Sequence, residues 1–137
     1  MSARFYLWTS ALSSAVCVAL GAFGAHGLKQ VVSVDMLATY QTGVQYQFIH
    51  SLALLALAIF LFMPAAKVVS KLLKISANFM IVGIMLFSGS LYTMTFMSAA
   101  DGFPAWLGPI TPIGGLAFIM GWIFLLVAAF KLPIDEQ

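Results

Sequence analysis

The chain has 137 residues, of which 63% are apolar and only 7% are charged, whereas soluble domains carry about 25% charged residues. A surface so poor in charge would aggregate in water, so the composition excludes a soluble globular domain and predicts a single membrane domain over residues 1–137. The formal net charge of +2 comes from six basic and four acidic residues, too few for a surface that binds nucleic acid.

The first predicted membrane span covers residues 5–25, which carry no charged side chain. A helix rises about 1.5 Å per residue, so this run is long enough to cross a hydrocarbon core of about 30 Å. The next residues, 26–34, are too polar and glycine-interrupted to stay in lipid. Asp35 then offers a carboxylate that suits the N-cap of a second helix.

The second predicted helix has one face on which large residues recur at every fourth position. It is longer than the membrane core requires, so we expect residues 35–43 to form an interfacial helix that bends near Gly43 into a span over residues 44–63. Pro64 marks the end of that span, because proline lacks the N–H that a helix needs. The recurring residues are Met36, Tyr40, Val44 and Phe48.

Three lysines precede the third predicted span, which covers residues 75–100. Lys67, Lys71 and Lys74 are spaced by four and three residues, so a helix presents their ammonium groups on one face. We expect this basic face to lie at the membrane surface and to contact lipid headgroups. Membrane lipids are thus the first partners that the sequence predicts.

A connector rich in proline and glycine, which includes Pro112, leads to the fourth predicted span over residues 113–130. Basic residues predict the orientation, since short cytoplasmic loops are enriched in lysine and arginine. With the N-terminus in the cytoplasm, only Lys29 among the basic residues lies outside. The sequence therefore predicts an all-α integral membrane four-helix bundle with both termini inside. The inner basic residues are Arg4, Lys67, Lys71, Lys74 and Lys131.

Several glycines are predicted to pack helices together, because transmembrane helices approach closely where side chains are small. Gly21 and Gly24 lie on the first span, and Gly114 and Gly115 lie on the fourth. Gly27 follows the first span, where a glycine with positive φ typically ends a helix. The run around Gly24 is not a phosphate-binding loop, because it follows a helix rather than a strand and lacks the lysine of such loops.

A candidate polar site is predicted around His26, at the outer end of the first span, and His50 in the second. Tyr46 lies one helical turn before His50, Gln47 lies beside that turn, and Tyr40 lies further along the same helix. An ionisable side chain is costly inside a membrane and usually faces protein or water, so His50 is the strongest single candidate. We expect both histidines in the outer half of the membrane, with His26 facing the second helix and His50.

The residues alone leave three interpretations of this site. In the first, a neutral imidazole hydrogen-bonds across helices and fixes their arrangement. In the second, His50 lies on a proton or solute pathway. In the third, His26 and His50 hold a haem or a metal ion, although two histidines make a weak metal signature. On balance we expect no cofactor and no metal.

Catalytic residues do not form a recognisable constellation, and we expect a protein that is not an enzyme. The serines are scattered, and the acidic residues fall in outer connectors or at the C-terminus, so no serine–histidine–acid or paired-carboxylate site can be assembled. Cys17 is the only cysteine and lies inside the first span. It cannot form an intramolecular disulfide and is expected to be a small core residue.

Five short segments of the sequence form a distinctive set of motifs. They are LGAFGAHGLK at residues 20–29, YQTGVQYQFIHSLALL at 40–55, SGSLY at 88–92, TPIGG at 111–115, and Gly121-Trp122. Together they resemble the YgdD-like family of small membrane proteins (domain of unknown function 423, UPF0382). The resemblance covers nearly the whole chain. It implies a multi-pass protein of the bacterial inner membrane, and it implies no reaction.

Two classes of function follow. The favoured hypothesis is a packing or accessory protein, a four-helix unit that forms a homo-oligomer or joins a larger membrane complex through small-residue faces. The alternative is a small transporter or proton-conducting unit whose polar path is centred on His50 and includes Tyr46 and Gln47.

Overall fold

Four long helical segments make up the described part of the molecule. The computed structural model describes residues 1–99, 102 and 104–132, and no strand occurs among them. Four of its helical segments are long and apolar enough to span a membrane, which confirms the predicted all-α membrane bundle. In chain order the elements are α1 (Ala3–His26), η1 (Leu28–Gln30), α2 (Val34–Phe60), η2 (Pro64–Lys67), α3 (Ser70–Gly83), η3 (Ile84–Ser88), α4 (Gly89–Ser98), η4 (Ala105–Leu107) and α5 (Ile110–Phe130).

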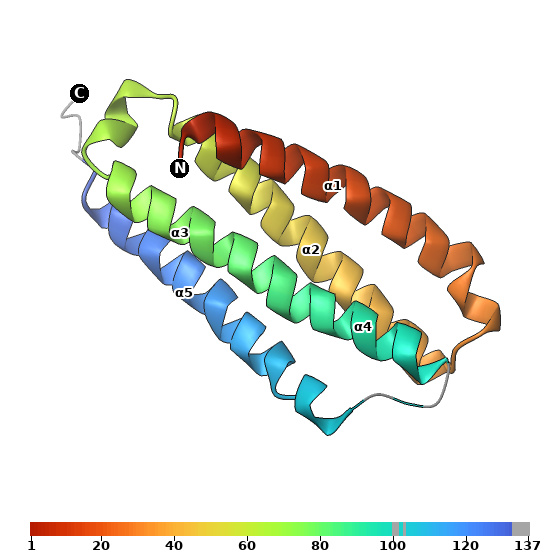
Figure 1. Cartoon of the computed structure of the whole chain (residues 1–137). Helices are drawn as coiled ribbons and strands as arrows, with labels where there is room; N and C mark the ends of the chain where they lie inside the picture. Colours follow the sequence, from red (N-terminus) through yellow and green to blue (C-terminus); the bar gives the residue numbers. More distant parts are fainter. Residues whose placement is uncertain (100–101, 103, 133–137) are drawn as a thin grey trace.

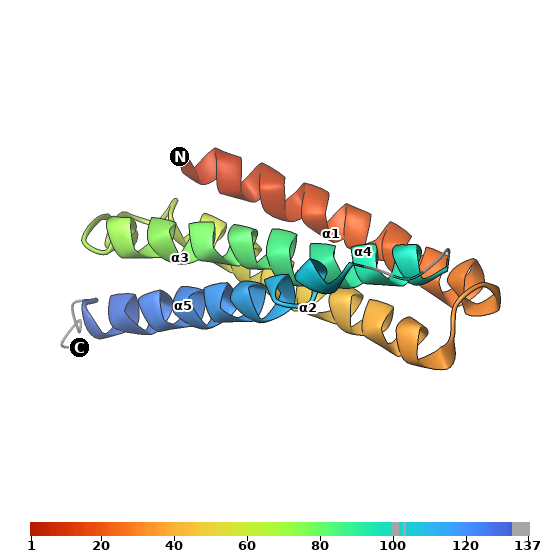
Figure 2. The same ribbon diagram turned by 60° about the horizontal axis from the view of Figure 1, so that its bottom comes forward.

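The central helices of the bundle are α2 and the continuous span formed by α3, η3 and α4. α1 packs along α2, and α5 packs along α3 and η3, while α2 also contacts α3, η3 and α4. Figure 1 and Figure 2 show α1 and α5 at opposite edges of the bundle. The start of α1, the end of α2, the start of α3 and the end of α5 lie together at one end (Figure 1). The basic residues predict that this end faces the cytoplasm.

The second span differs from its prediction at both ends. Its N-cap is Ser33, whose hydroxyl accepts a hydrogen bond from the Met36 N–H at 3.3 Å, so the prediction of Asp35 as the cap was wrong. Asp35 lies in the first turn, where its negative charge still favours the helix N-terminus. α2 is continuous through Gly43 and ends at Phe60. The residues predicted to form an interfacial helix are therefore the outer turns of α2.

The third span begins before its predicted start and contains a change of helix type. α3 starts at Ser70, so two of the predicted surface lysines, Lys71 and Lys74, belong to its first turns. Between α3 and α4, the five residues of η3 form a π-helix, which inserts an extra residue into the helical turn. The predicted end of this span at residue 100 lies outside the described residues.

The fourth span starts at Ile110, so the prediction that Pro112 belongs to the connector was wrong. Proline is tolerated in the first turn because the N–H groups there have no partner within the helix. The predicted end of the span at Phe130 agrees with the structure.

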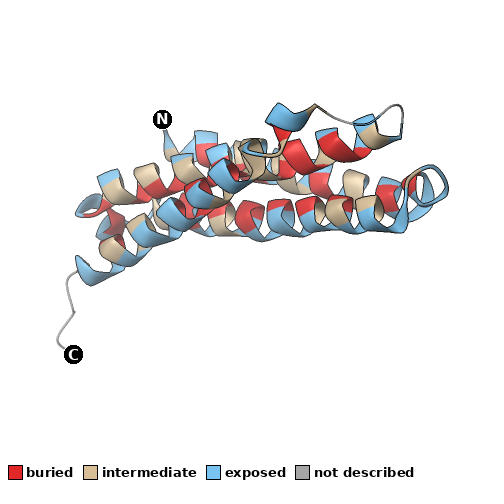
Figure 3. Ribbon diagram, turned by 90° about the horizontal axis from the view of Figure 1, so that it is seen from below, coloured by how far each residue is buried: buried red, intermediate tan, exposed pale blue. Residues whose placement is uncertain are grey.

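Burial is distributed unevenly between the spans. The main apolar cluster lies towards the end that holds the start of α1, and it draws on all four spans. In Figure 3 buried residues form stripes that face inward, while the outer faces of the helices are exposed. α1 is the least buried span and contributes one narrow stripe. Its buried residues are Tyr6, Ser10, Cys17 and Gly24.

Candidate functional site

His50 is buried between α2 and α5, where both of its ring nitrogens are engaged. Nδ1 lies 2.7 Å from the Tyr46 carbonyl oxygen, and Nε2 lies 3.2 Å from the indole nitrogen of Trp122. A carbonyl only accepts and an indole N–H only donates, so Nδ1 carries the proton and Nε2 is the acceptor. The Phe118 ring stacks on the imidazole, with centroids 3.4 Å apart and planes at 12°. This geometry holds a neutral imidazole in one tautomer.

Helix lengths place His50 close to the middle of a membrane core, at the inner limit of its predicted outer half. Its stacking partner Phe118 precedes the end of α5 at Phe130 by 12 residues. Those residues span about 18 Å at the helical rise, which is more than half of a core of about 30 Å. A neutral, fully hydrogen-bonded ring is the form of histidine that such a depth tolerates.

Tyr46 lies one turn outward from His50 and lines an open groove between α2 and α5. The groove has a volume of ≈ 670 Å³, and its walls are mostly apolar and aromatic. The Tyr46 ring lies 4.5 Å from the Phe87 ring and 5.8 Å from the imidazole, measured between centroids. Tyr46 and His50 are therefore brought together, as predicted, and Trp122 also lines the groove.

Gln47 belongs to a different cluster, on the side of α2 that faces α1 and α4. Its amide nitrogen donates to the Ser13 carbonyl at 3.0 Å and lies 3.3 Å from the Ser13 hydroxyl. Its amide oxygen accepts a hydrogen bond from the Tyr92 hydroxyl at 2.8 Å. The Ser13 and Ser51 hydroxyls are 2.7 Å apart. Through Ser13, Gln47 and Tyr92 the cluster links α1, α2 and α4. Gln47 thus fastens helices and does not share a site with His50.

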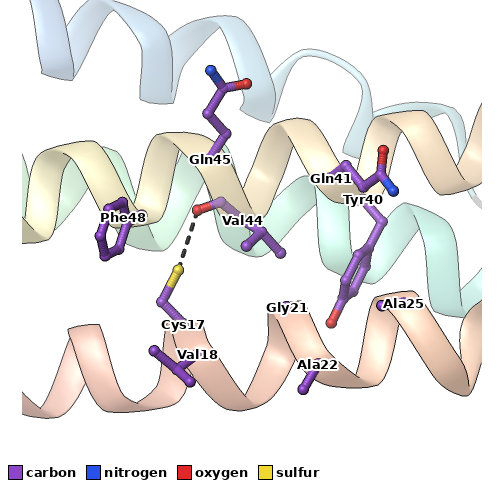
Figure 4. Close-up of a pocket in the computed structure, with 10 residues that line it drawn as sticks. All are labelled: Cys17, Val18, Gly21, Ala22, Ala25, Tyr40, Gln41, Val44, Gln45 and Phe48. Carbon is purple, nitrogen blue, oxygen red and sulfur yellow. Dashed lines mark hydrogen bonds between the residues drawn. The ribbon is translucent and has the colours of Figure 1, made fainter.

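Tyr40 lies further out and joins α2 to α1 (Figure 4). Its hydroxyl donates to the Leu20 carbonyl at 2.8 Å, and its ring centroid lies 5.0 Å from that of Tyr92. The ring covers Gly24, where a Cβ would lie only 2.6 Å from Tyr40 Cε1. Gly24 is therefore a packing glycine, as predicted, because only a residue without a side chain admits this ring.

His26 does not approach His50. It is exposed at the last residue of α1, whereas Gly24, just before it, packs against Tyr40. From Tyr40 to His50 there are ten residues of α2, or about 15 Å at the helical rise. Metal–nitrogen bonds are about 2.0–2.1 Å long, so one ion or haem iron cannot be held by both rings in this arrangement. The expectation that His26 faces His50 was wrong.

The four other predicted packing glycines differ in how closely a neighbouring group approaches them. At Gly114 the backbone and Cβ of Phe87 occupy the place of a side chain, so α5 and η3 approach there at backbone distance. At Gly115 and Gly21 a Cβ would find ordinary contacts, at 3.8 Å and 3.6 Å. Gly27 has φ −84°, so the predicted positive φ was wrong. The chain continues from α1 into η1 without reversing, and the Phe23 ring fills the space beside Gly27.

Two further sequence predictions concern single residues. Cys17 is buried, and its thiol donates to the Val44 carbonyl at 3.2 Å, which confirms a small core residue. Lys67 and Lys71 are exposed at the end of the bundle that holds the start of α1, while Lys74 is half-buried. Their contact with lipid headgroups stays a prediction.

Polar groups inside the bundle are almost all paired. Among residues 1–99, 102 and 104–132, the Ser88 hydroxyl is the only buried side-chain polar atom without a hydrogen-bond partner. The Ser76 hydroxyl donates to the Gly121 carbonyl at 2.7 Å, and the Ser90 and Thr111 hydroxyls lie 2.7 Å apart, so α3 and α4 are both bonded to α5. No group of three or more metal-ligating side chains occurs in this described part of the chain.

Comparison with known proteins gives the family. The family model described as "Protein of unknown function (DUF423)" matches residues 20–115, which is more than half of the chain. The chain belongs to the DUF423 family. The UPF0382 membrane protein of Haemophilus influenzae is 43% identical to it over 126 residues, which cover 92% of this chain and 94% of the relative.

Two further relatives carry the same UPF0382 designation as the first. The inner membrane protein YgdD of Escherichia coli K12 is 39% identical over 96% of this chain and 94% of its own length. The membrane protein YwdK of Bacillus subtilis is 39% identical over 93% and 98%. No solved structure matches the chain. These names and the four apolar helices show that this DUF423 protein is a multi-pass protein of the bacterial inner membrane.

Sequence reasoning missed the partners of the predicted site residues. Trp122 and Tyr92 stood within two of the family motifs, but nothing tied them to His50 and Gln47. A signal was present, because a buried indole N–H or phenol in an apolar helix needs a hydrogen-bond partner. Phe118 carried no comparable signal, since an apolar ring in an apolar helix has no obligatory partner.

Proposed function

We propose that this protein is a packing or accessory component of the inner membrane, without catalytic activity, that acts by associating with other membrane helices. The observation that carries the proposal is the pairing of its central polar groups. Both nitrogens of the His50 ring and both ends of the Gln47 amide are engaged inside the bundle. Polar groups paired in this way hold transmembrane helices in one arrangement, which is the role of a structural unit.

A proton path through His50 has less support. A proton can reach Nε2 only after the Trp122 N–H moves away, and it can leave Nδ1 only after the bond to the Tyr46 carbonyl breaks. The ring is also clamped by Phe118, which opposes the ring rotation that a relay requires. These contacts favour the structural role of His50 over the transport role.

Proton flux in vesicles separates the two roles. Proteoliposomes that contain the wild-type chain should acidify no faster than protein-free vesicles when a pH gradient is imposed. His50→Ala should lower the thermal stability of the detergent-solubilised protein without changing the flux. A wild-type flux that disappears in a folded His50→Ala protein would establish the transport role instead.

Association in the membrane tests the proposal directly. A chain expressed at its native level and cross-linked within intact membranes should give discrete adducts, either with itself or with another inner-membrane protein. A chain with His50→Ala that still folds should give the same adducts, because the ring lies inside the bundle. If only the uncross-linked single chain appears under conditions that trap a known membrane complex, the proposal is wrong.

A further inference from the structure

One exposed face of α2 carries polar side chains in its outer half and apolar ones further in. The exposed residues follow the three- and four-residue spacing of one helical face, which borders a groove toward α1 and another toward α5. This surface, the glutamine face, consists of Ala38, Gln41, Thr42, Gln45, Ile49 and Leu52.

Two amide side chains on this face have no partner. Gln41 and Gln45 are exposed and make no hydrogen bond to any described residue, whereas the Thr42 hydroxyl donates to the Ala38 carbonyl at 3.0 Å. In Figure 4 Tyr40 reaches toward α1, while Gln45 leaves α2 on the side away from α1. The two amides lie one helical turn apart and so present two donors and one acceptor each in the same direction.

The depth of these amides makes their lack of partners costly. Gln45 precedes the end of α2 at Phe60 by 15 residues, or about 22 Å at the helical rise. A core of about 30 Å that starts at Phe60 therefore places Gln45 inside its outer edge and Gln41 close to that edge. An unpaired amide within hydrocarbon loses the hydrogen bonds that it would make in water.

Two other exposed polar side chains within the spans make hydrogen bonds inside the bundle. The amide oxygen of Asn78 accepts a hydrogen bond from the Tyr6 hydroxyl at 2.9 Å, and the Thr93 hydroxyl donates to the Gly89 carbonyl at 2.8 Å. The exposed face of α5 is apolar, with residues such as Leu116 and Ile123. The glutamine face thus offers a partner helix two amides, one turn apart, that make no hydrogen bond to the described residues.

We infer that the glutamine face binds a second copy of this chain, which deepens the proposed function by naming its partner. An amide is self-complementary, because it both donates and accepts, so glutamine pairs with glutamine. Two copies share one orientation in the membrane, and a two-fold axis along the membrane normal then brings each residue near the axis against its own counterpart. Gln45 of one copy hydrogen-bonds to Gln45 of the second copy, and the two Gln41 side chains meet one turn further out.

The shape of the surface beside the face suits a helical partner. An open groove of ≈ 610 Å³ runs between α1 and α2, and it includes Gln41, Gln45 and Phe48 (Figure 4). The groove of ≈ 670 Å³ between α2 and α5 begins on the other side, at Ile49. The glutamine face is therefore the ridge between two grooves, and apolar side chains of the second copy can enter them on either side of the paired amides.

Counting subunits in lipid tests the inference. The full chain, fused to a fluorescent protein and reconstituted in phospholipid vesicles at low density, should bleach mainly in two steps. The double variant Gln41→Leu and Gln45→Leu should bleach mainly in one step at the same density, because removing both amide pairs weakens dimerisation by about tenfold or more. The control Thr93→Val removes an exposed polar group outside the face, whose hydrogen bond to Gly89 lies within its own helix, and should keep the two steps.

Cysteine cross-linking locates the contact. In a Cys17→Ala background, Gln45→Cys should form a disulfide-linked species of twice the chain mass in membranes under mild oxidation. Met85→Cys is the control, because Met85 is 70% exposed on η3 and lies outside the face. Gln45→Asn, which keeps an amide, should retain two bleaching steps and covers the case in which the cysteine variant does not fold.

Several results would overturn the inference. They are single-step bleaching of the wild type, two steps in the double leucine variant, or cross-linking at Met85→Cys but not at Gln45→Cys. Cross-linked adducts that contain only a different protein would rule out the second copy as the partner. They would leave the proposed accessory function in place. An absence of any adduct, or a His50-dependent proton flux, would remove the proposed function itself.

Discussion

The contact between α3 and α5 and the contact between α1 and α2 are built by different means. α5 meets the α3–η3 segment at backbone distance, where Gly114 admits Phe87 and Gly83 admits the Phe118 ring. α1 meets α2 mainly through hydrogen bonds from Gln47 and Tyr40, with one close approach at Gly24. The α5 contact is built mainly from glycines that admit aromatic rings, with the Ser76–Gly121 hydrogen bond added. The α1 contact is built mainly from hydrogen bonds.

Grooves border α1 on both sides, whereas α5 has open grooves toward α2 and close packing toward α3. A helix that is held by a narrow stripe leaves space on both sides, and α1 is bordered by the groove of ≈ 610 Å³ toward α2 and by one of ≈ 280 Å³ toward α3. The α3–α5 contact leaves less room, because Phe87 and Phe118 fill the space that the glycines provide. The comparison predicts that α5 is the more firmly attached edge of the bundle and α1 the less firmly attached one.

The largest expected effect comes from a methyl group at the backbone contact. Gly114→Ala places a Cβ against the backbone of Phe87, which cannot rotate away as a side chain can. We expect a loss of about 3 kcal/mol in the free energy of unfolding, measured by denaturation in mixed micelles, because overpacking of a tight contact costs about 1–3 kcal/mol.

The neighbouring glycine is the control for that change. Gly115→Ala meets Phe87 ring atoms at 3.8 Å, an ordinary contact, so the free energy of unfolding should change by less than about 1 kcal/mol. Equal losses at the two positions would show that η3 and α5 are not in backbone contact and would remove the distinction drawn between the two edges.

A smaller loss of stability is expected when the hydrogen bonds between α1 and α2 are removed. Gln47→Leu removes the hydrogen bonds to Ser13 and Tyr92, which should lower the free energy of unfolding by about 1–2 kcal/mol. It should also speed thiol labelling of Cys17, which is buried between α1 and α2. Gln45→Leu in dilute detergent is the matched control, because Gln45 makes no hydrogen bond within the described part of the chain. Unchanged labelling in Gln47→Leu would mean that other contacts hold α1.

Much of the fold could be predicted from the sequence, because the spans depend on the run of apolar residues and on breakers near their ends. The errors fell on the ends of helices. Ser33 rather than Asp35 caps α2, and Pro112 lies inside α5, since first-turn positions tolerate several residue types. The π-helix at η3 left no trace in the apolar pattern, because neither helix type changes which residues are apolar.

The candidate site was only partly predictable. Tyr46 and His50 are one turn apart on a single helix, so their proximity follows from helix geometry alone. Gln47 and His50 differ by three residues and yet face different neighbours, because the rotation of α2 about its axis is decided by packing against α1, η3 and α5. His50 and Trp122 lie on different helices, so their hydrogen bond can be predicted only when the positions of α2 and α5 relative to each other are known.

The smallest expected effect concerns the polar link between α2 and α5, which is otherwise a contact of rings. Trp122→Phe keeps an aromatic ring but removes the N–H that donates to His50, so we expect a loss of about 0.5–1 kcal/mol in the free energy of unfolding. Trp106→Phe, at an indole that is 64% exposed, should change it little. A double-mutant cycle with His50→Phe isolates the pair, since the coupling energy should match the loss in Trp122→Phe alone. A coupling energy near zero would mean that stacking on Phe118, rather than the hydrogen bond, attaches His50 to α5. The α5 edge would then depend even less on polar groups than the α1 edge does.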